Sequence, residues 1–102
     1  MSLTPADIAY EFEGGPARGR LVARAAGRDG EGEVRWSRAG DGLVVAEFAG
    51  VPKAWEGTGV AAAMVTHFIE NARKNGDKVI PACGYVAALG RRNPDWADVM
   101  SV

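Results

Sequence analysis

Hydrophobic and polar residues follow two periods along this chain, that of strands in its first half and that of helices in its second. Between residues 8 and 49, short alternating runs are separated by glycine-rich breaks, a pattern typical of strands joined by turns. Runs at residues 20–25, 33–38 and 43–49 predict an antiparallel meander. The run at 43–49 is the most apolar, so we expect it to be the central strand.

An earlier run, at residues 8–13, also alternates but has two interpretations. As a strand it would add to the meander. As a short helix it would have Thr4 as its cap, Pro5 in its first position and Gly14 at its end. We favour the strand.

The longest periodic segment predicts a helix over residues 60–75. Its stripe of apolar residues has helical spacing, Gly76 suits the position just past a helix end, and Arg73 and Lys74 suit the negative end of the helix dipole. A short strand at 78–80 and a second helix at 85–92 follow. The fold expected is therefore α+β, a mainly antiparallel twisted sheet with one right-handed βαβ crossover.

A tight turn, Gly57-Thr58-Gly59, leads directly into the long helix. Such a turn presents unpaired backbone N–H groups at the positive end of a helix, which favours a bound phosphate. The letters GTGVAA also fit the dinucleotide fingerprint G-x-G-x-x-A. That fingerprint needs a strand running straight into the first glycine, whereas residues 51–56 intervene here, and Asp77 precedes the next strand instead of ending it.

Length and composition limit the number of domains and the classes of partner, but they do not identify a reaction. A length of 102 residues predicts a single domain, residues 1–102, and a formal net charge of −1 argues against broad nucleic-acid or membrane-surface binding. The single cysteine forbids an intrachain disulfide, and with one histidine no metal site is expected. No signal-peptide pattern and no membrane-length apolar run is seen, so we expect a cytoplasmic protein.

Four motifs, in this order and spacing, resemble the small single-domain branch of the Gcn5-related N-acetyltransferases. The resemblance covers roughly residues 18–100, nearly the whole chain. The motifs lie at residues 51–52 (VP), 56–61 (EGTGVA), 79–83 (VIPAC) and 93–99 (NPDWADV).

This resemblance implies a minimal acyltransferase fold that binds acetyl-CoA. The diphosphate would lie on the turn before the long helix, the pantetheine arm near Val51, and the second helix over the other side of the cofactor. Arg91, Arg92 and Asn93 either reach a CoA phosphate or form a solvated helix end. The cofactor-binding residues implied are Val51, Glu56, Gly57, Thr58, Gly59, Val60, Ala61, Arg91, Arg92 and Asn93.

Two positions depart from the family pattern. Ala54 stands where the wider superfamily favours Gln or Arg, three residues before the first glycine. Phe48 and Ala49 stand where the small branch usually has His-Thr. The cofactor site is thus better preserved than the catalytic one.

Cys83 and Glu47 are the candidate catalytic residues. Cys83 stands where a helix begins, which lowers a thiol pKa, so it could accept the acetyl group or protonate the departing CoA thiolate; its alternative role is that of a small buried hydrophobe. Glu47, near the end of the 43–49 strand, could deprotonate an ammonium substrate, or be only a solvent-facing charge. His67 is expected to be a solvated surface residue.

The function expected is acetyl transfer from acetyl-CoA to a small-molecule or protein amine. A CoA-binding or acyl-CoA-binding module with little transferase activity is the alternative, and the missing His-Thr pair favours it. We expect a monomer or weak homodimer.

Overall fold

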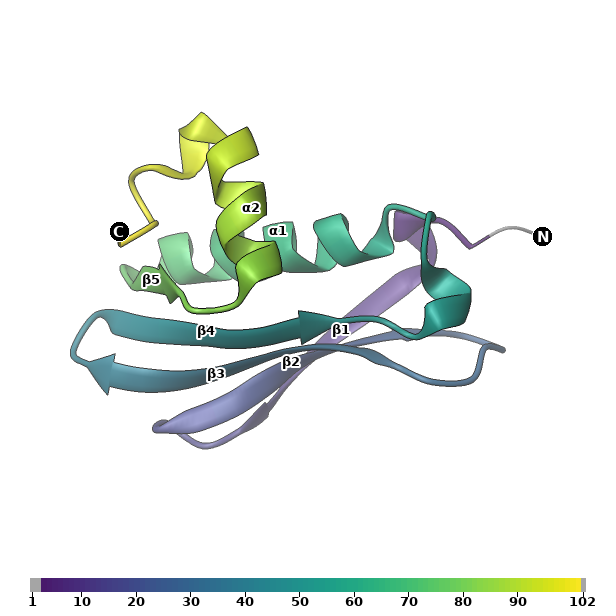
Figure 1. Cartoon of the computed structure of the whole chain (residues 1–102). Coiled ribbons are helices and arrows are strands. Elements are labelled where there is room, and N and C mark those ends of the chain that lie inside the picture. The colour runs from purple at the N-terminus through teal and green to yellow at the C-terminus, as the bar shows by residue number, and fades with distance from the viewer. Residues whose placement is uncertain (1–2, 102) are drawn as a thin grey trace.

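The computed structural model describes residues 3–101, which form five strands and two α-helices (Figure 1). The sheet runs in the order β1-β2-β3-β4-β5. The strands are β1 (Ile8–Gly14), β2 (Arg18–Ala25), β3 (Gly32–Gly40), β4 (Leu43–Gly50) and β5 (Lys78–Pro81), and the helices are α1 (Val60–Asn75) and α2 (Gly84–Arg92).

From β1 to β4, each strand pairs antiparallel with the next strand along the chain. Strand β5 pairs parallel to β4 after the chain crosses through α1. This confirms the predicted α+β architecture and its single βαβ crossover. The prediction that residues 43–49 form the central strand is wrong, because β1 and β2 add to one side and place β3 in the middle.

The N-terminal run is a strand, as we favoured, but part of the helical alternative also survives. Pro5–Asp7 form one turn of 3-10 helix. The backbone N–H of Thr4 donates to the Asp7 carboxylate at 2.9 Å, which closes the turn before β1 begins at Ile8. The residues that predicted a helix start thus form one helical turn, and the alternating residues that follow it form a strand.

Both helices lie on the same side of the sheet in Figure 1, and the main core fills the space between. Leu21, Val34 and Val79 from the strands meet Ile69 of α1 and Val86 of α2, and all five are fully buried. On the opposite face, Arg20 and Arg24 of β2 form ion pairs with four glutamates. The glutamates are Glu11, Glu13, Glu31 and Glu33.

The C-terminal segment holds α2 in place. Residues 99–101 lie along the outer edge of β5, where Val79 N–H donates to Val99 O at 2.8 Å and Ser101 N–H to Val79 O at 2.7 Å. Arg73, in the last turn of α1, donates two hydrogen bonds of 2.8 and 2.9 Å to the Asp98 carboxylate. These bonds lower the pKa of Asp98 below its ordinary value. The segment after α2 is thus tied to both β5 and α1.

Candidate functional site

The turn before α1 has the left-handed backbone that its glycines predict. Gly57 has φ of +79° and Gly59 has φ of +85°, values that side-chain-bearing residues rarely adopt. Trp55, just before the turn, is 2% exposed and packs with Leu3 and Val60, which fixes the turn against the body of the protein.

At the mouth of α1, four backbone N–H groups have no acceptor within residues 3–101, those of Gly57, Gly59, Ala61 and Ala62. The first backbone bond of the helix runs from Ala63 N–H to Gly59 O, at 3.1 Å. The first turn contains no acidic side chain that would cap these groups or repel an anion. The mouth of the helix is therefore open to an external acceptor.

Three of the residues predicted to hold the diphosphate use their own N–H inside the protein. Glu56 N–H donates to Lys53 O, Thr58 N–H to Trp55 O, and Val60 N–H to the Thr58 hydroxyl at 3.3 Å. The Glu56 side chain is exposed. Sequence reasoning missed Ala62, whose N–H is free because it belongs to the third helical residue.

Strand β4 carries a bulge at Glu47. Arg35 of β3 lies opposite Phe48 and Trp36 lies opposite Ala46, so Glu47 is an extra residue without a partner. On its other edge, β4 pairs with β5 only as far as Ala46. Beyond that point no backbone bond within residues 3–101 fills the β5-side edge of residues 47–51, including Val51.

Cys83 is the N-cap residue of α2, the position that the sequence indicated. Its N–H donates to Ala46 O at 3.0 Å, and its O accepts from Ala87 N–H at 3.0 Å. The thiol is half-buried against the main core and has no hydrogen-bond partner among the described residues. Cys83 thus stands where β4 and β5 separate.

Glu47 follows Ala46, whose carbonyl accepts from Cys83 N–H, but the Glu47 carboxylate lies on the other face of the sheet. The hydroxyl of Ser37, which points away from the helices, donates to the Glu47 carboxylate at 3.1 Å. There Glu47 lines a hollow of about 450 Å³ together with Arg18, Arg20 and Arg35. An amine that uses Glu47 as a base would have to approach from this face.

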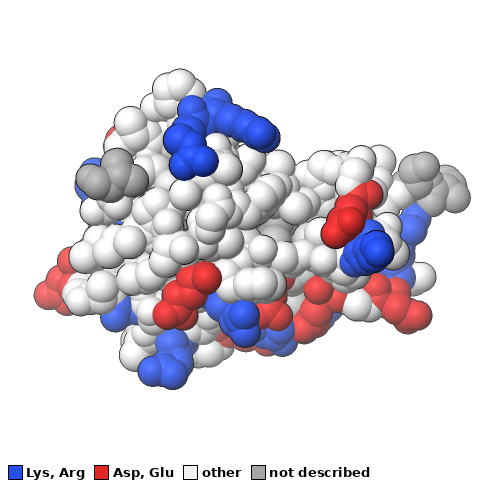
Figure 2. Space-filling model, in the orientation of Figure 1, with Lys and Arg blue, Asp and Glu red and all other residues white. Residues whose placement is uncertain are grey.

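The basic end of α2 lies away from the glycine turn. Arg91 and Arg92 are exposed in its last turn, and the Asn93 amide donates to Leu89 O at 2.8 Å, which occupies it as a helix cap. Figure 2 shows positive side chains over this end of α2, and uncharged surface between it and the start of α1.

His67 is exposed, as expected, and its ring stacks on that of Tyr10 with centroids 4.2 Å apart. Within residues 3–101 no three His, Cys, Asp or Glu side chains form a group that could hold a metal ion. None of the helices described is both long and apolar enough to cross a membrane.

A family model described as GCN5-related N-acetyl-transferase matches residues 20–99. The chain belongs to this family. The match includes every candidate site residue from Glu47 to Asn93, begins within β2 and leaves out β1. No curated protein matches the chain.

Proposed function

We propose that this N-acetyltransferase family member transfers acetyl from acetyl-CoA to a small-molecule or protein amine. The observation that carries the proposal is the set of unpaired N–H groups at the mouth of α1 in a chain of this family. A sixteen-residue helix directs its positive end at that point, and an uncapped, acid-free helix start favours a phosphate ligand.

The diphosphate of CoA would accept hydrogen bonds from Gly57, Gly59, Ala61 and Ala62. Its pantetheine arm would follow the free edge of residues 47–51, which offers backbone donors and acceptors in the way a neighbouring strand would use them. The uncharged surface between α2 and the start of α1 suits an arm that carries no charge (Figure 2).

The acetyl group would then lie near Cys83, where β4 and β5 part. An amine must be neutral to attack a thioester, and Glu47 would accept the ammonium proton directly or through a water molecule. Cys83 would protonate the departing CoA thiolate, or accept the acetyl group first and pass it to the amine. In either route the second proton of the attacking amine passes to the Cys83 thiolate as the amide forms, which restores the free thiol.

A second function, CoA binding without efficient transfer, is favoured by one observation. Phe48 occupies the position where related small acetyltransferases usually have His, and its ring lies beneath the Arg35 guanidinium at 4.4 Å. A phenyl ring has no group that can accept or donate a proton. The Glu47 carboxylate, facing away from Cys83, also favours slow transfer.

Calorimetric titration with CoA tests the binding site, and CoA thiol release from acetyl-CoA with a panel of amines tests transfer. We expect binding with the wild type, and release that falls in Cys83→Ala and in Glu47→Gln but not in Asp41→Asn, a control in an exposed turn. Absence of CoA binding would contradict both functions. CoA binding without thiol release for any amine would contradict acetyl transfer and support the second function, CoA binding alone.

A further inference from the structure

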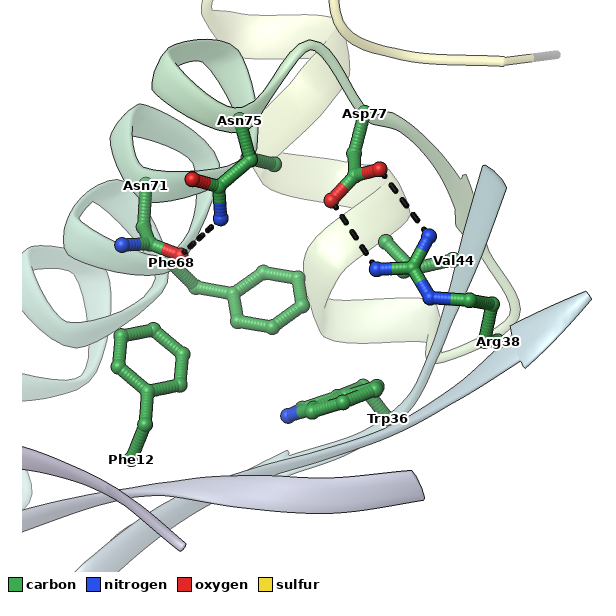
Figure 3. A pocket seen from close by; sticks show the side chains of 9 residues that line it. Phe12, Trp36, Arg38, Val44, Phe68, Asn71, Asn75 and Asp77 are labelled. Atoms are coloured by element: carbon green, nitrogen blue, oxygen red, sulfur yellow. Dashed lines mark hydrogen bonds and ion pairs between the residues drawn. The ribbon is translucent and has the colours of Figure 1, made fainter. Parts of the chain in front are cut away.

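A pocket of about 200 Å³ lies between the C-terminal half of α1 and the sheet (Figure 3). The Trp36 ring forms its floor, and the rings of Phe12 and Phe68 stand over it. The pocket is at the opposite end of α1 from the glycine turn. Phe12 belongs to β1, outside the range that the family model matches.

The indole nitrogen of Trp36 is buried and has no hydrogen-bond partner among the described residues. Figure 3 shows this nitrogen at the end of the ring nearest Phe12, beside the open space. A buried donor without an acceptor is destabilising, and native proteins seldom leave one unsatisfied. The floor of the pocket therefore offers one hydrogen bond to a guest that brings an acceptor.

The charged residues on the rim cancel one another. Arg38 and Asp77 form a two-pronged ion pair, with nitrogen–oxygen distances of 3.1 and 3.3 Å, and the Asp77 side chain is only 10% exposed. A cation would meet Arg38 and the indole N–H, and an anion would meet Asp77. A neutral guest avoids both penalties.

Asn71 and Asn75 complete the rim on the α1 side. The Asn75 amide nitrogen donates to the Asn71 amide oxygen at 3.1 Å, which holds both side chains over the pocket (Figure 3). The Asn71 amide nitrogen and the Asn75 amide oxygen have no partner within residues 3–101. Each amide can still make one contact with a polar substituent.

The volume sets the size of the guest. An apolar protein cavity of about 150 Å³ is large enough to hold benzene. A pocket of about 200 Å³ with three aromatic walls therefore accommodates one ring with a small substituent.

We propose that this pocket binds a neutral single-ring molecule that carries a hydrogen-bond acceptor for the Trp36 indole. The proposal is independent of acetyl transfer, since none of the lining residues belongs to the candidate cofactor site.

A series of similar shape but different charge tests the proposal: benzamide, benzamidine, benzoate and ethylbenzene. Nitrogen–proton NMR spectra of the full chain show three indole signals, and Trp36→Phe identifies that of Trp36 by its loss. We expect benzamide to shift this signal saturably and to bind more tightly than the other three probes. In Trp36→Phe, followed at the Ala72 backbone amide, benzamide should bind about three- to tenfold more weakly, because the hydrogen bond is lost.

Phe12→Ala and Phe48→Ala are a matched pair, since the two side chains are 41% and 40% exposed. Phe12→Ala should weaken benzamide binding and Phe48→Ala should not. An indole signal that does not respond to benzamide, or an equal loss in both variants, would overturn the proposal. Ethylbenzene binding as tightly as benzamide would overturn the role of the indole N–H, and tighter binding of either ion would overturn the preference for a neutral guest.

Discussion

The substitution Ala61→Asp separates anion binding at the mouth of α1 from folding, because it should change the two in opposite directions. Ala61 is the second residue of the helix, its side chain is partly exposed, and no acidic residue is present in the first turn. A carboxylate there interacts favourably with the helix dipole, by about 0.3–1 kcal/mol. The unliganded variant should therefore melt a few degrees above the wild type.

The same carboxylate would repel a diphosphate held by the neighbouring N–H groups. At a separation of about 6 Å, each pair of negative charges costs roughly 0.7 kcal/mol in a water-like dielectric and roughly 2.8 kcal/mol at an effective dielectric of 20. Two charges on the diphosphate give at least about 1.4 kcal/mol, a tenfold loss of CoA affinity. The loss should shrink as salt is added.

Calorimetric titration with CoA and thermal melting measure the two effects on one sample. Thr66→Asp is the control, since it adds the same charge at an exposed position about 7.5 Å further along the helix and should leave CoA affinity nearly unchanged. If Ala61→Asp binds CoA within twofold of the wild type, or if Thr66→Asp loses as much affinity, CoA is not held by these N–H groups.

Three further predictions concern stability. Ile69→Ala, at a fully buried site, should lower the free energy of unfolding by about 2–5 kcal/mol in denaturant titration. Arg73 lowers the pKa of Asp98, so this pair should stabilise the fold above about pH 4 and lose its effect as the carboxylate is protonated. In Asp98→Asn the melting temperature should therefore fall less steeply with decreasing pH below about pH 4. Partial desolvation lowers the pKa of His67, so its protonation should destabilise the fold below about pH 6.5. His67→Phe, which keeps a ring against Tyr10, should remove this part of the pH dependence of the melting temperature.

Local signals predicted the elements well. The helix at 60–75 has its expected bounds because both ends are marked by glycines with positive φ, Gly59 and Gly76. The strands lie in the sheet in the order of the chain, so the middle strand follows from their number: with β1 counted, β3 is the third of five. The prediction that 43–49 is central relied on apolar content, and that strand is apolar because α1 and α2 cover it.

The candidate site was predictable only in part, because some of its features depend on contacts that residue spacing does not reveal. Glycine spacing located the open helix mouth, but not the Thr58 hydroxyl that accepts from Val60 N–H. Nothing local to residues 43–50 reveals that Glu47 is an extra residue, because a bulge exists only relative to the facing strand. The direction of the Glu47 carboxylate therefore could not be read from alternation.

That extra residue amounts to a mismatch in length between two neighbouring strands. From Ala46 to Phe48 the chain of β4 takes two steps while β3, from Trp36 to Arg35, takes one. The surplus bends β4 where β5 stops following it, and a bulge increases local twist. We propose that this gap, where the cofactor arm would lie, depends on a count of residues rather than on a side chain. Replacing Glu47 would preserve the gap, whereas deleting that one position would let the strands realign and close it.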